Sequence, residues 1–169
     1  MWNQCCCHDM ANKNNKIKPY QLLIPVITVL VAFLGSQLTN VGLKDWYFLI
    51  EKPAWTPPGS TIGMVWTVIF ILTALSAFIV YSKKPKNIRT ITTLFMINAG
   101  LNIFWSALFF VFHALQIATI EAGVLALSVV ALIINIWPVS KVASLLLIPY
   151  AAWVSFATYL TYMVSSINP

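Results

Sequence analysis

Five long apolar runs alternate with shorter polar segments along the chain. They lie at about residues 20–38, 62–81, 90–112, 114–137 and 142–167. A helix needs about 20 apolar residues to cross the hydrocarbon core of a bilayer, and each run is close to that length. The runs do not alternate apolar and polar residues with a period of two, which argues against membrane-spanning β-strands. The pattern predicts an all-α fold, an integral membrane bundle of five transmembrane helices over residues 19–169, after a disordered N-terminal tail over residues 1–18.

The charge distribution predicts how the bundle sits in the membrane. Charged residues are 8% of the chain, against roughly 25% in soluble domains, which excludes a water-soluble enzyme or a nucleic-acid binder. Eight of the ten basic residues lie in the tail and in the connections after the second and fourth runs. Basic residues collect on the cytoplasmic side of membrane proteins. We therefore expect a multi-pass protein with a cytoplasmic N-terminus and an external C-terminus.

Residues for conventional catalysis or metal binding are sparse. Cys5, Cys6 and Cys7 are consecutive, with His8 beside them, and one backbone cannot easily wrap three adjacent sulfurs around a tetrahedral metal. A disordered tail or a reactive thiol remain as interpretations. His113 follows the third run among phenylalanines, where an interfacial histidine is the simpler interpretation and haem ligation the alternative. We predict no metal site and no required cofactor.

The third run carries a polar stripe on one helical face. Asn98, Asn102, Trp105 and Phe109 are spaced by four, three and four residues, so they fall within a stripe about 60° wide. Two amides and an indole are costly against lipid, so the stripe is expected to face the bundle interior. Hydrogen bonding between helices and the polar rim of an internal cavity explain it equally well.

Two other runs carry matching aromatic faces. Trp66 and Phe70 share a face of the second run, and Tyr150, Trp153 and Ala157 share a face of the fifth. Ala157 is small and lies one turn beyond a tryptophan, which leaves room for a flat ring.

The connection at residues 39–61 is long and apolar, and it contains Trp55 and three prolines. It is expected to fold onto the outer mouth of the bundle, either as a lid over a cavity or as an interfacial anchor. Two features of the fourth run also have two interpretations each. Glu121 near the start of the run caps the helix or contributes to packing or a ligand. The small residues at Ala118, Ala122 and Ala126 serve internal packing or a homodimer face.

Four segments, in order, resemble the motifs of the tryptophan-rich sensory protein/translocator protein family, also called the peripheral-type benzodiazepine receptor family. They are EKPAWTPPG at 51–59 followed by Trp66, LNxxWxxxFF at 101–110, ATIE at 118–121, and LIPYxxWxxFA at 147–157. The resemblance covers about residues 20–168.

This resemblance implies a five-helix bundle, often dimeric, with one pocket beneath the first loop. It implies porphyrins such as protoporphyrin IX and haem as ligands, with sterols in doubt because no basic residue follows Tyr162. The predicted ligand-binding residues are Trp55, Pro57, Trp66, Phe70, Asn98, Asn102, Trp105, Tyr150, Trp153 and Ala157. The Lys- and Asn-rich tail suits a bacterial member, located in the cell membrane. The resemblance implies a homodimer.

Three functions follow as hypotheses. The first is a membrane receptor or sensor for a flat tetrapyrrole. The second is a light- and oxygen-dependent enzyme that degrades protoporphyrin IX with Trp66 and Trp153 as catalytic residues, as is reported for some bacterial members. The third is a transporter, which the scarcity of charge inside the runs disfavours.

Overall fold

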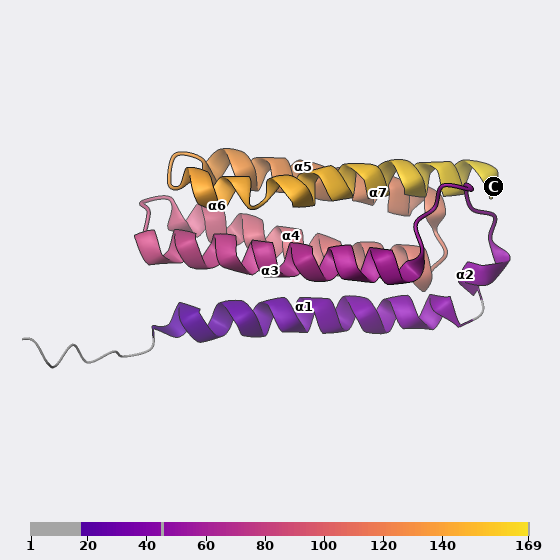
Figure 1. Cartoon of the computed structure of the whole chain (residues 1–169), viewed down its shortest axis with the longest axis horizontal. Coiled ribbons are helices and arrows are strands. Elements are labelled where there is room, and N and C mark those ends of the chain that lie inside the picture. The colour runs from indigo at the N-terminus through magenta and orange to yellow at the C-terminus, as the bar shows by residue number, and fades with distance from the viewer. Residues whose placement is uncertain (1–17, 45, 169) are drawn as a thin grey trace, which may run out of the picture.

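The structure, a computed structural model, describes residues 18–44 and 46–168, and over these residues the chain forms helices without a strand. The helices are α1 (Pro19–Leu43), α2 (Trp46–Leu49), α3 (Gly59–Lys83), α4 (Ile88–Phe110), α5 (Leu115–Ile136), α6 (Lys141–Leu145) and α7 (Ile148–Ile167). Five segments are long and apolar enough to cross a membrane, α6 and α7 together forming the fifth (Figure 1). The predicted all-α bundle of five spans is confirmed. Cys5, Cys6, Cys7 and His8 lie outside the described residues.

The first two spans are longer than the hydropathy pattern predicts. α1 continues to Leu43 rather than ending near residue 38, and α3 begins at Gly59 rather than near residue 62. α1 continues through the polar residues after Leu38, and the Thr39 hydroxyl is satisfied within the helix because it donates to the Gly35 carbonyl at 2.8 Å. The connection between these spans is therefore shorter than the expected 39–61.

The fifth span is interrupted near its start. α6 ends at Leu145 and α7 begins at Ile148, just before Pro149. Proline has no N–H to donate to the carbonyl four residues earlier, so a continuous helix is weakened at this position. The break leaves α6 free to pack against α3, where the Ser76 hydroxyl donates to the Ala143 carbonyl at 2.7 Å.

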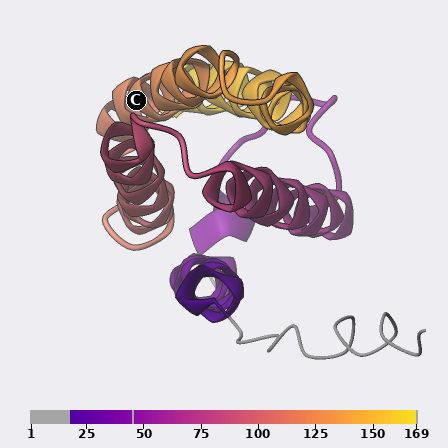
Figure 2. The ribbon, with the colours of Figure 1, turned by 90° about the vertical axis from the view of Figure 1, so that its left-hand side faces the viewer.

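The helices follow the order α1, α4, α5, α7 and α3 around the bundle (Figure 2). α5 packs along both α4 and α7, whereas α3 touches α7 only slightly and is held mainly by α1 and α6. α1 is the least buried of the five spans, and only Val31 and Gly42 are buried along it. The result is a tight pair formed by α5 and α7 on one side and loosely packed helices on the other.

The small residues of α5 pack inside a single copy of the chain. Ala118 and Ala122 are 0% and 2% exposed. This agrees with the internal-packing interpretation, and it removes these two residues from any homodimer face.

The end of α1 approaches α4 very closely at Gly42. A Cβ atom at this position would lie 2.6 Å from the Phe110 carbonyl oxygen and 2.9 Å from the Phe110 Cβ. Only glycine allows this contact without a shift of one backbone. The contact places α1 against the end of α4 directly below α2.

Candidate functional site

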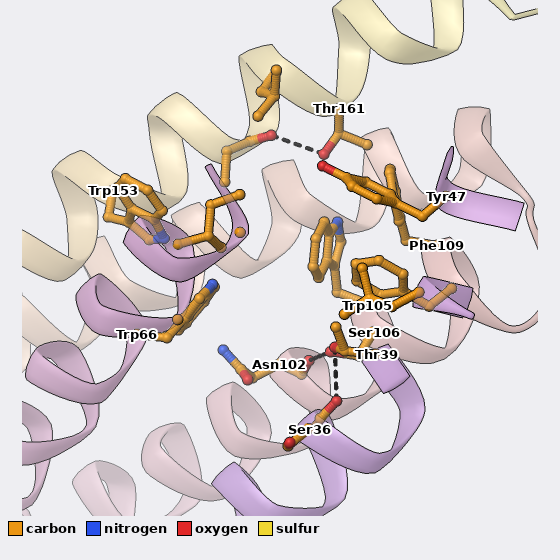
Figure 3. A pocket seen from close by; sticks show the side chains of 18 of the residues that line it. Ser36, Thr39, Tyr47, Trp66, Asn102, Trp105, Ser106, Phe109, Trp153 and Thr161 are labelled. Carbon is orange, nitrogen blue, oxygen red and sulfur yellow. Dashed lines mark hydrogen bonds between the residues drawn. The ribbon is translucent and has the colours of Figure 1, made fainter. Parts of the chain in front are cut away.

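A cavity of about 650 Å³ lies between α1, α3, α4 and α7, with α2 at its end (Figure 3). Pockets for small molecules typically measure about 300–1,000 Å³ and have mostly apolar walls with a few polar groups. Its walls fit that description. They include Gly35, Ser36, Thr39, Leu43, Tyr47, Ile62, Trp66, Phe70, Asn102, Trp105, Ser106, Phe109, Phe110, Trp153, Phe156, Ala157, Leu160 and Thr161.

Three tryptophans from three different helices line this cavity. Trp66 comes from α3, Trp105 from α4 and Trp153 from α7, and the first and last face Trp105 across the cavity (Figure 3). The indole nitrogens of Trp105 and Trp153 are buried and find no hydrogen-bond partner among the described residues. A buried indole N–H ordinarily has a partner, and because these two nitrogens have almost no accessible surface, Trp105 and Trp153 meet the cavity with their rings.

The tryptophans are held by other aromatic rings. Trp105 stacks on Phe109 with ring centroids 5.3 Å apart, and Phe109 meets Phe110 edge to face at 4.8 Å. Trp66 lies 5.7 Å from Phe70. Because rings packed in this way have few alternative rotamers, the cavity walls keep their shape in the absence of a ligand.

The polar stripe of α4 divides between two roles. Asn98 donates from Nδ2 to the Ser128 hydroxyl at 2.8 Å and accepts at Oδ1 from the Tyr150 hydroxyl at 3.1 Å, so it bonds α4 to α5 and α7. Asn102 donates to the Tyr150 hydroxyl at 3.3 Å and also lines the cavity. The hydrogen-bonding interpretation therefore applies to both asparagines, and the cavity-rim interpretation applies to Asn102.

The structure brings six of the ten predicted ligand-binding residues to this cavity: Trp66, Phe70, Asn102, Trp105, Trp153 and Ala157. Asn98 and Tyr150 lie beside a smaller neighbouring cavity instead. Trp55 and Pro57 line neither cavity. Trp55 stacks on Tyr159 of α7 at 5.8 Å and 11°, because the proline-rich segment passes outside the bundle before α3 begins.

Sequence reasoning did not find the contribution of α1. Ala32, Gly35, Ser36, Thr39 and Leu43 line the cavity from this helix. They follow the pattern i, i+3, i+4, i+7 and i+11 along the chain, which places them on one helical face and is a usable signal. Their small size hid them, because small residues in a membrane helix are equally typical of close helix packing.

The segment after α1 covers one end of the cavity and is also an apolar surface. Trp46, Tyr47 and Ile50 pack onto the buried ends of α4, α5 and α7, and Tyr47 reaches the cavity. Phe48 and Leu49 are 74% and 81% exposed, as expected for an interfacial anchor. Both the lid and the anchor interpretations therefore describe part of this segment.

Lys52 fixes the position of Tyr47. The Lys52 ammonium donates to the carbonyls of Tyr47 and Ile50, at 2.5 and 3.0 Å, and lies 4.5 Å from the centre of the Tyr47 ring. Burial raises the pKa of the Tyr47 hydroxyl above its usual value of 10.0, so this group stays neutral at physiological pH. The cavity end of the segment is thus an uncharged phenol, held in place by the half-buried ammonium of Lys52.

The C-terminal end of α7 holds the same segment in place. The Glu51 backbone N–H donates to Asn168 Oδ1 at 3.0 Å, and Asn168 Nδ2 donates back to the Glu51 carbonyl at 2.9 Å. Asn168 Nδ2 also donates to the Val164 carbonyl at 2.9 Å. One amide side chain therefore joins the segment to α7 through a reciprocal pair.

Replacing Asn168 with alanine is expected to loosen this segment. Both hydrogen bonds to Glu51 are lost, each worth about 0.5–1.5 kcal/mol, which predicts amide hydrogen exchange at Glu51 faster by about tenfold. Ser166→Ala is the matched control, because Ser166 bonds only to the Met163 carbonyl of its own helix. Equal exchange at Glu51 in the two variants would contradict the assignment.

Glu121 does not cap α5. The helix begins at Leu115 with no acidic residue in its first turn, so the capping prediction is wrong. Glu121 is 6% exposed, and neither carboxylate oxygen has a hydrogen-bond partner in the described part of the chain. It does not line the large cavity, so it belongs to the packed interior of the bundle.

His113 lies outside the cavity. Its side chain is exposed and stacks on Trp46 with ring centroids 4.1 Å apart. Among the described residues, no cluster of three or more His, Cys, Asp or Glu side chains is placed to hold a metal ion.

The fold and the cavity define a class: a helical membrane-protein bundle of five spans around an aromatic pocket. The sequence profile of the TspO/MBR family matches residues 23–167. The chain belongs to this family and is an integral multi-pass membrane protein. Family membership supports a role as a membrane sensor or receptor.

Curated relatives cover almost the whole chain. The tryptophan-rich protein TspO of Bacillus cereus is 38% identical over 152 residues, which is 90% of this chain and 99% of the relative. The tryptophan-rich protein TspO of Chlorobaculum tepidum is 36% identical over 82% of this chain and 89% of its own. The human translocator protein is 28% identical over 79% of this chain and 80% of its own.

Proposed function

We propose that the protein is a membrane receptor or sensor that binds porphyrins, such as protoporphyrin IX or haem, and related flat apolar molecules in the large cavity. The observation that carries the proposal is the meeting of Trp66, Trp105 and Trp153, from three helices, at one cavity of about 650 Å³. Large aromatic walls suit a flat conjugated ring, because stacked aromatic groups contribute beyond the area that they bury.

The polar groups at the cavity also suit a porphyrin. The carboxamide of Asn102 offers a hydrogen bond to a carboxylate at a porphyrin edge. Ala157 has a small side chain, so it leaves space in the cavity beside Trp153.

The proposed orientation has a cytoplasmic N-terminus in a bacterial cell membrane. The start of α1, the connection from α3 to α4 and the connection from α5 to α6 lie at the same end of the bundle, opposite α2 (Figure 1). Lys83, Lys84, Lys86, Arg89 and Lys141 lie in or beside these two connections, as the positive-inside rule requires of a cytoplasmic face. A homodimer, which the family resemblance implies, stays a prediction.

Tryptophan fluorescence tests the binding proposal. Protoporphyrin IX added to the protein in lipid nanodiscs is expected to quench the fluorescence saturably, with an affinity about tenfold lower in Trp153→Phe, because stacking area is lost. Trp137→Phe is the control, because Trp137 is exposed and distant from the cavity lining. Equal affinities in the two variants, or no saturable quenching, would count against the proposal.

A second candidate function is light-dependent degradation of protoporphyrin IX. It is favoured by the presence of Trp66 and Trp153 in one cavity, where an excited porphyrin can accept an electron from an indole and dioxygen serves as the oxidant. Illumination in air separates the two functions. A new absorbing product that is absent in Trp66→Phe and Trp153→Phe indicates the enzyme, and unchanged porphyrin indicates the receptor.

A further inference from the structure

The large cavity is open on one side of the bundle, and its exposed lining residues show which side. All of them belong to α1 or α3: Ser36, Asn40, Gly59, Gly63 and Thr67. The lining residues of α4 and α7, such as Trp105 and Trp153, are buried or half-buried. The cavity therefore reaches the outer surface of the bundle between α1 and α3.

α1 and α3 also make aromatic contacts at the opposite end of the bundle. The Tyr20 ring, at the start of α1, lies 5.7 Å from the Phe78 ring and 6.1 Å from the Tyr81 ring, near the end of α3. The Tyr20 and Ser82 hydroxyls lie 3.4 Å apart. These contacts hold the two helices together at the end away from α2 (Figure 1). The opening lies at the α2 end and does not interrupt them.

Glycines border the opening on its α3 side. The helices run antiparallel and the contacts of Tyr20 fix their register, so Ser36 and Asn40 of α1 lie level with Gly63 and Gly59 of α3. A Cβ atom at either glycine would meet nothing within 4 Å. Because neither residue has a side chain and no neighbour fills the place of one, the space beside them stays free.

The opening lies in the leaflet of the membrane on the α2 side. α1 ends at Leu43, and at 1.5 Å per residue Ser36 and Asn40 lie within about 11 Å of that end. Polar side chains are costly deep among acyl chains, whereas they are well placed where the headgroups begin. An amphiphile dissolved in this leaflet holds its polar groups at the headgroups and its apolar part below. It therefore reaches the opening with its polar groups level with Asn40.

We propose that the large cavity takes its ligand sideways from the bilayer, through the opening between α1 and α3. The ligand is then an amphiphile already dissolved in the leaflet on the α2 side. This inference rests on the proposed function, because the amphiphile tested is a porphyrin, whose carboxylates pass Asn40 while its ring passes Gly59 and Gly63. The segment after α1 is a fixed cover and not the entrance, since Lys52 and Asn168 hold it in place.

Leucine at Gly63 tests the opening. Its side chain occupies the free space, so protoporphyrin IX is expected to bind about tenfold more slowly to Gly63→Leu than to the wild type in nanodiscs. Dissociation is expected to slow by a similar factor, because the ligand leaves by the same opening, and the affinity therefore changes less than either rate. The measurement is the rate of tryptophan quenching after rapid mixing, and of its recovery after empty vesicles are added.

Gly100→Leu is the matched control for Gly63→Leu. Gly100 is an exposed glycine of α4 that lines neither cavity, and a Cβ atom there also meets nothing within 4 Å. Its rates are expected to equal those of the wild type. Equal association rates in the two variants, or a weaker affinity of Gly63→Leu at an unchanged association rate, would overturn the proposal.

Asn168→Ala tests the alternative entrance beneath the segment after α1. Loss of the reciprocal pair with Glu51 loosens that segment, and a ligand that enters beneath it would bind faster. The lateral route instead predicts the association rate of the wild type. Faster association in this variant overturns the proposal.

A lipid-soluble thiol reagent tests the opening without a porphyrin. In a chain whose three cysteines are replaced by serine, Ala157→Cys places a single thiol in the large cavity. N-pyrenylmaleimide is expected to label this thiol about tenfold more slowly when Gly63→Leu is added, and at an unchanged rate when Gly100→Leu is added. Equal labelling rates in these two variants overturn the proposal. Slower labelling with Gly63→Leu alone, together with no saturable porphyrin quenching, refutes the porphyrin function and supports the opening.

Discussion

Replacing Ala157 with phenylalanine is expected to weaken porphyrin binding about 5- to 150-fold while the bundle still folds. Ala157 lines the large cavity beside Trp153 and Phe156. A phenyl ring there occupies space that the porphyrin needs, and forcing extra bulk into a packed site costs about 1–3 kcal/mol, where 1.4 kcal/mol is a tenfold change in affinity. The measurement is the dissociation constant for protoporphyrin IX from tryptophan quenching in nanodiscs.

The matched control for this experiment is Ala152→Phe. It places the same ring on the exposed side of the same helix and is expected to leave the affinity unchanged. If both variants bind protoporphyrin as tightly as the wild type, Ala157 does not face the ligand. If Ala157→Phe also lowers the unfolding temperature sharply, loss of packing rather than loss of space explains the result.

Replacing Gly42 with valine is expected to reduce the free energy of unfolding by about 3 kcal/mol, at the upper end of the cost of overpacking. The added Cβ would meet the Phe110 carbonyl oxygen at 2.6 Å, and that oxygen belongs to a backbone that cannot swing aside. Relief of the clash requires the end of α1 to move away from α4. We expect a lower unfolding temperature and faster hydrogen exchange in the segment after α1.

Gly100→Val provides the comparison for Gly42→Val. A Cβ at Gly100 meets nothing within 4 Å, and glycine in a helix interior costs about 1 kcal/mol relative to alanine. This variant is expected to be neutral or slightly more stable. A similar loss of stability in both variants would mean that the contact between Gly42 and Phe110 is not specific.

The five spans were predictable because membrane helices carry a strong and simple signal. Apolar runs of the right length define them, and the polar stripe of α4 and the aromatic faces of α3 and α7 point inward, as their cost in lipid requires. Trp66, Trp105 and Trp153 were found in this way and meet at one cavity. The helix ends were less predictable, because α1 continues through the polar residues after Leu38, where the Thr39 hydroxyl bonds to the Gly35 carbonyl of the same helix.

The parts that sequence reasoning missed depend on how helices lie relative to one another. Trp55 sits in a motif rich in proline and tryptophan but stacks on the outer side of α7, and no hydropathy pattern states on which side a loop passes. The hydropathy pattern places Glu121 near enough to the expected helix start to cap it. In the structure α5 begins at Leu115, so Glu121 lies in the second turn. No sequence pattern predicts the role of Asn168, because its reciprocal hydrogen bonds join it to Glu51, 117 positions away along the chain.

The exposure of α1 has a consequence for biosynthesis. Among the five spans α1 is synthesised first, so most of its partners in the bundle are still unmade when it enters the bilayer. Since most of its exposed side chains are apolar, it can wait there as a single inserted helix, with most of its polar side chains gathered near its C-terminal end. Assembly can then be completed by lateral docking, after α5 and α7 have paired.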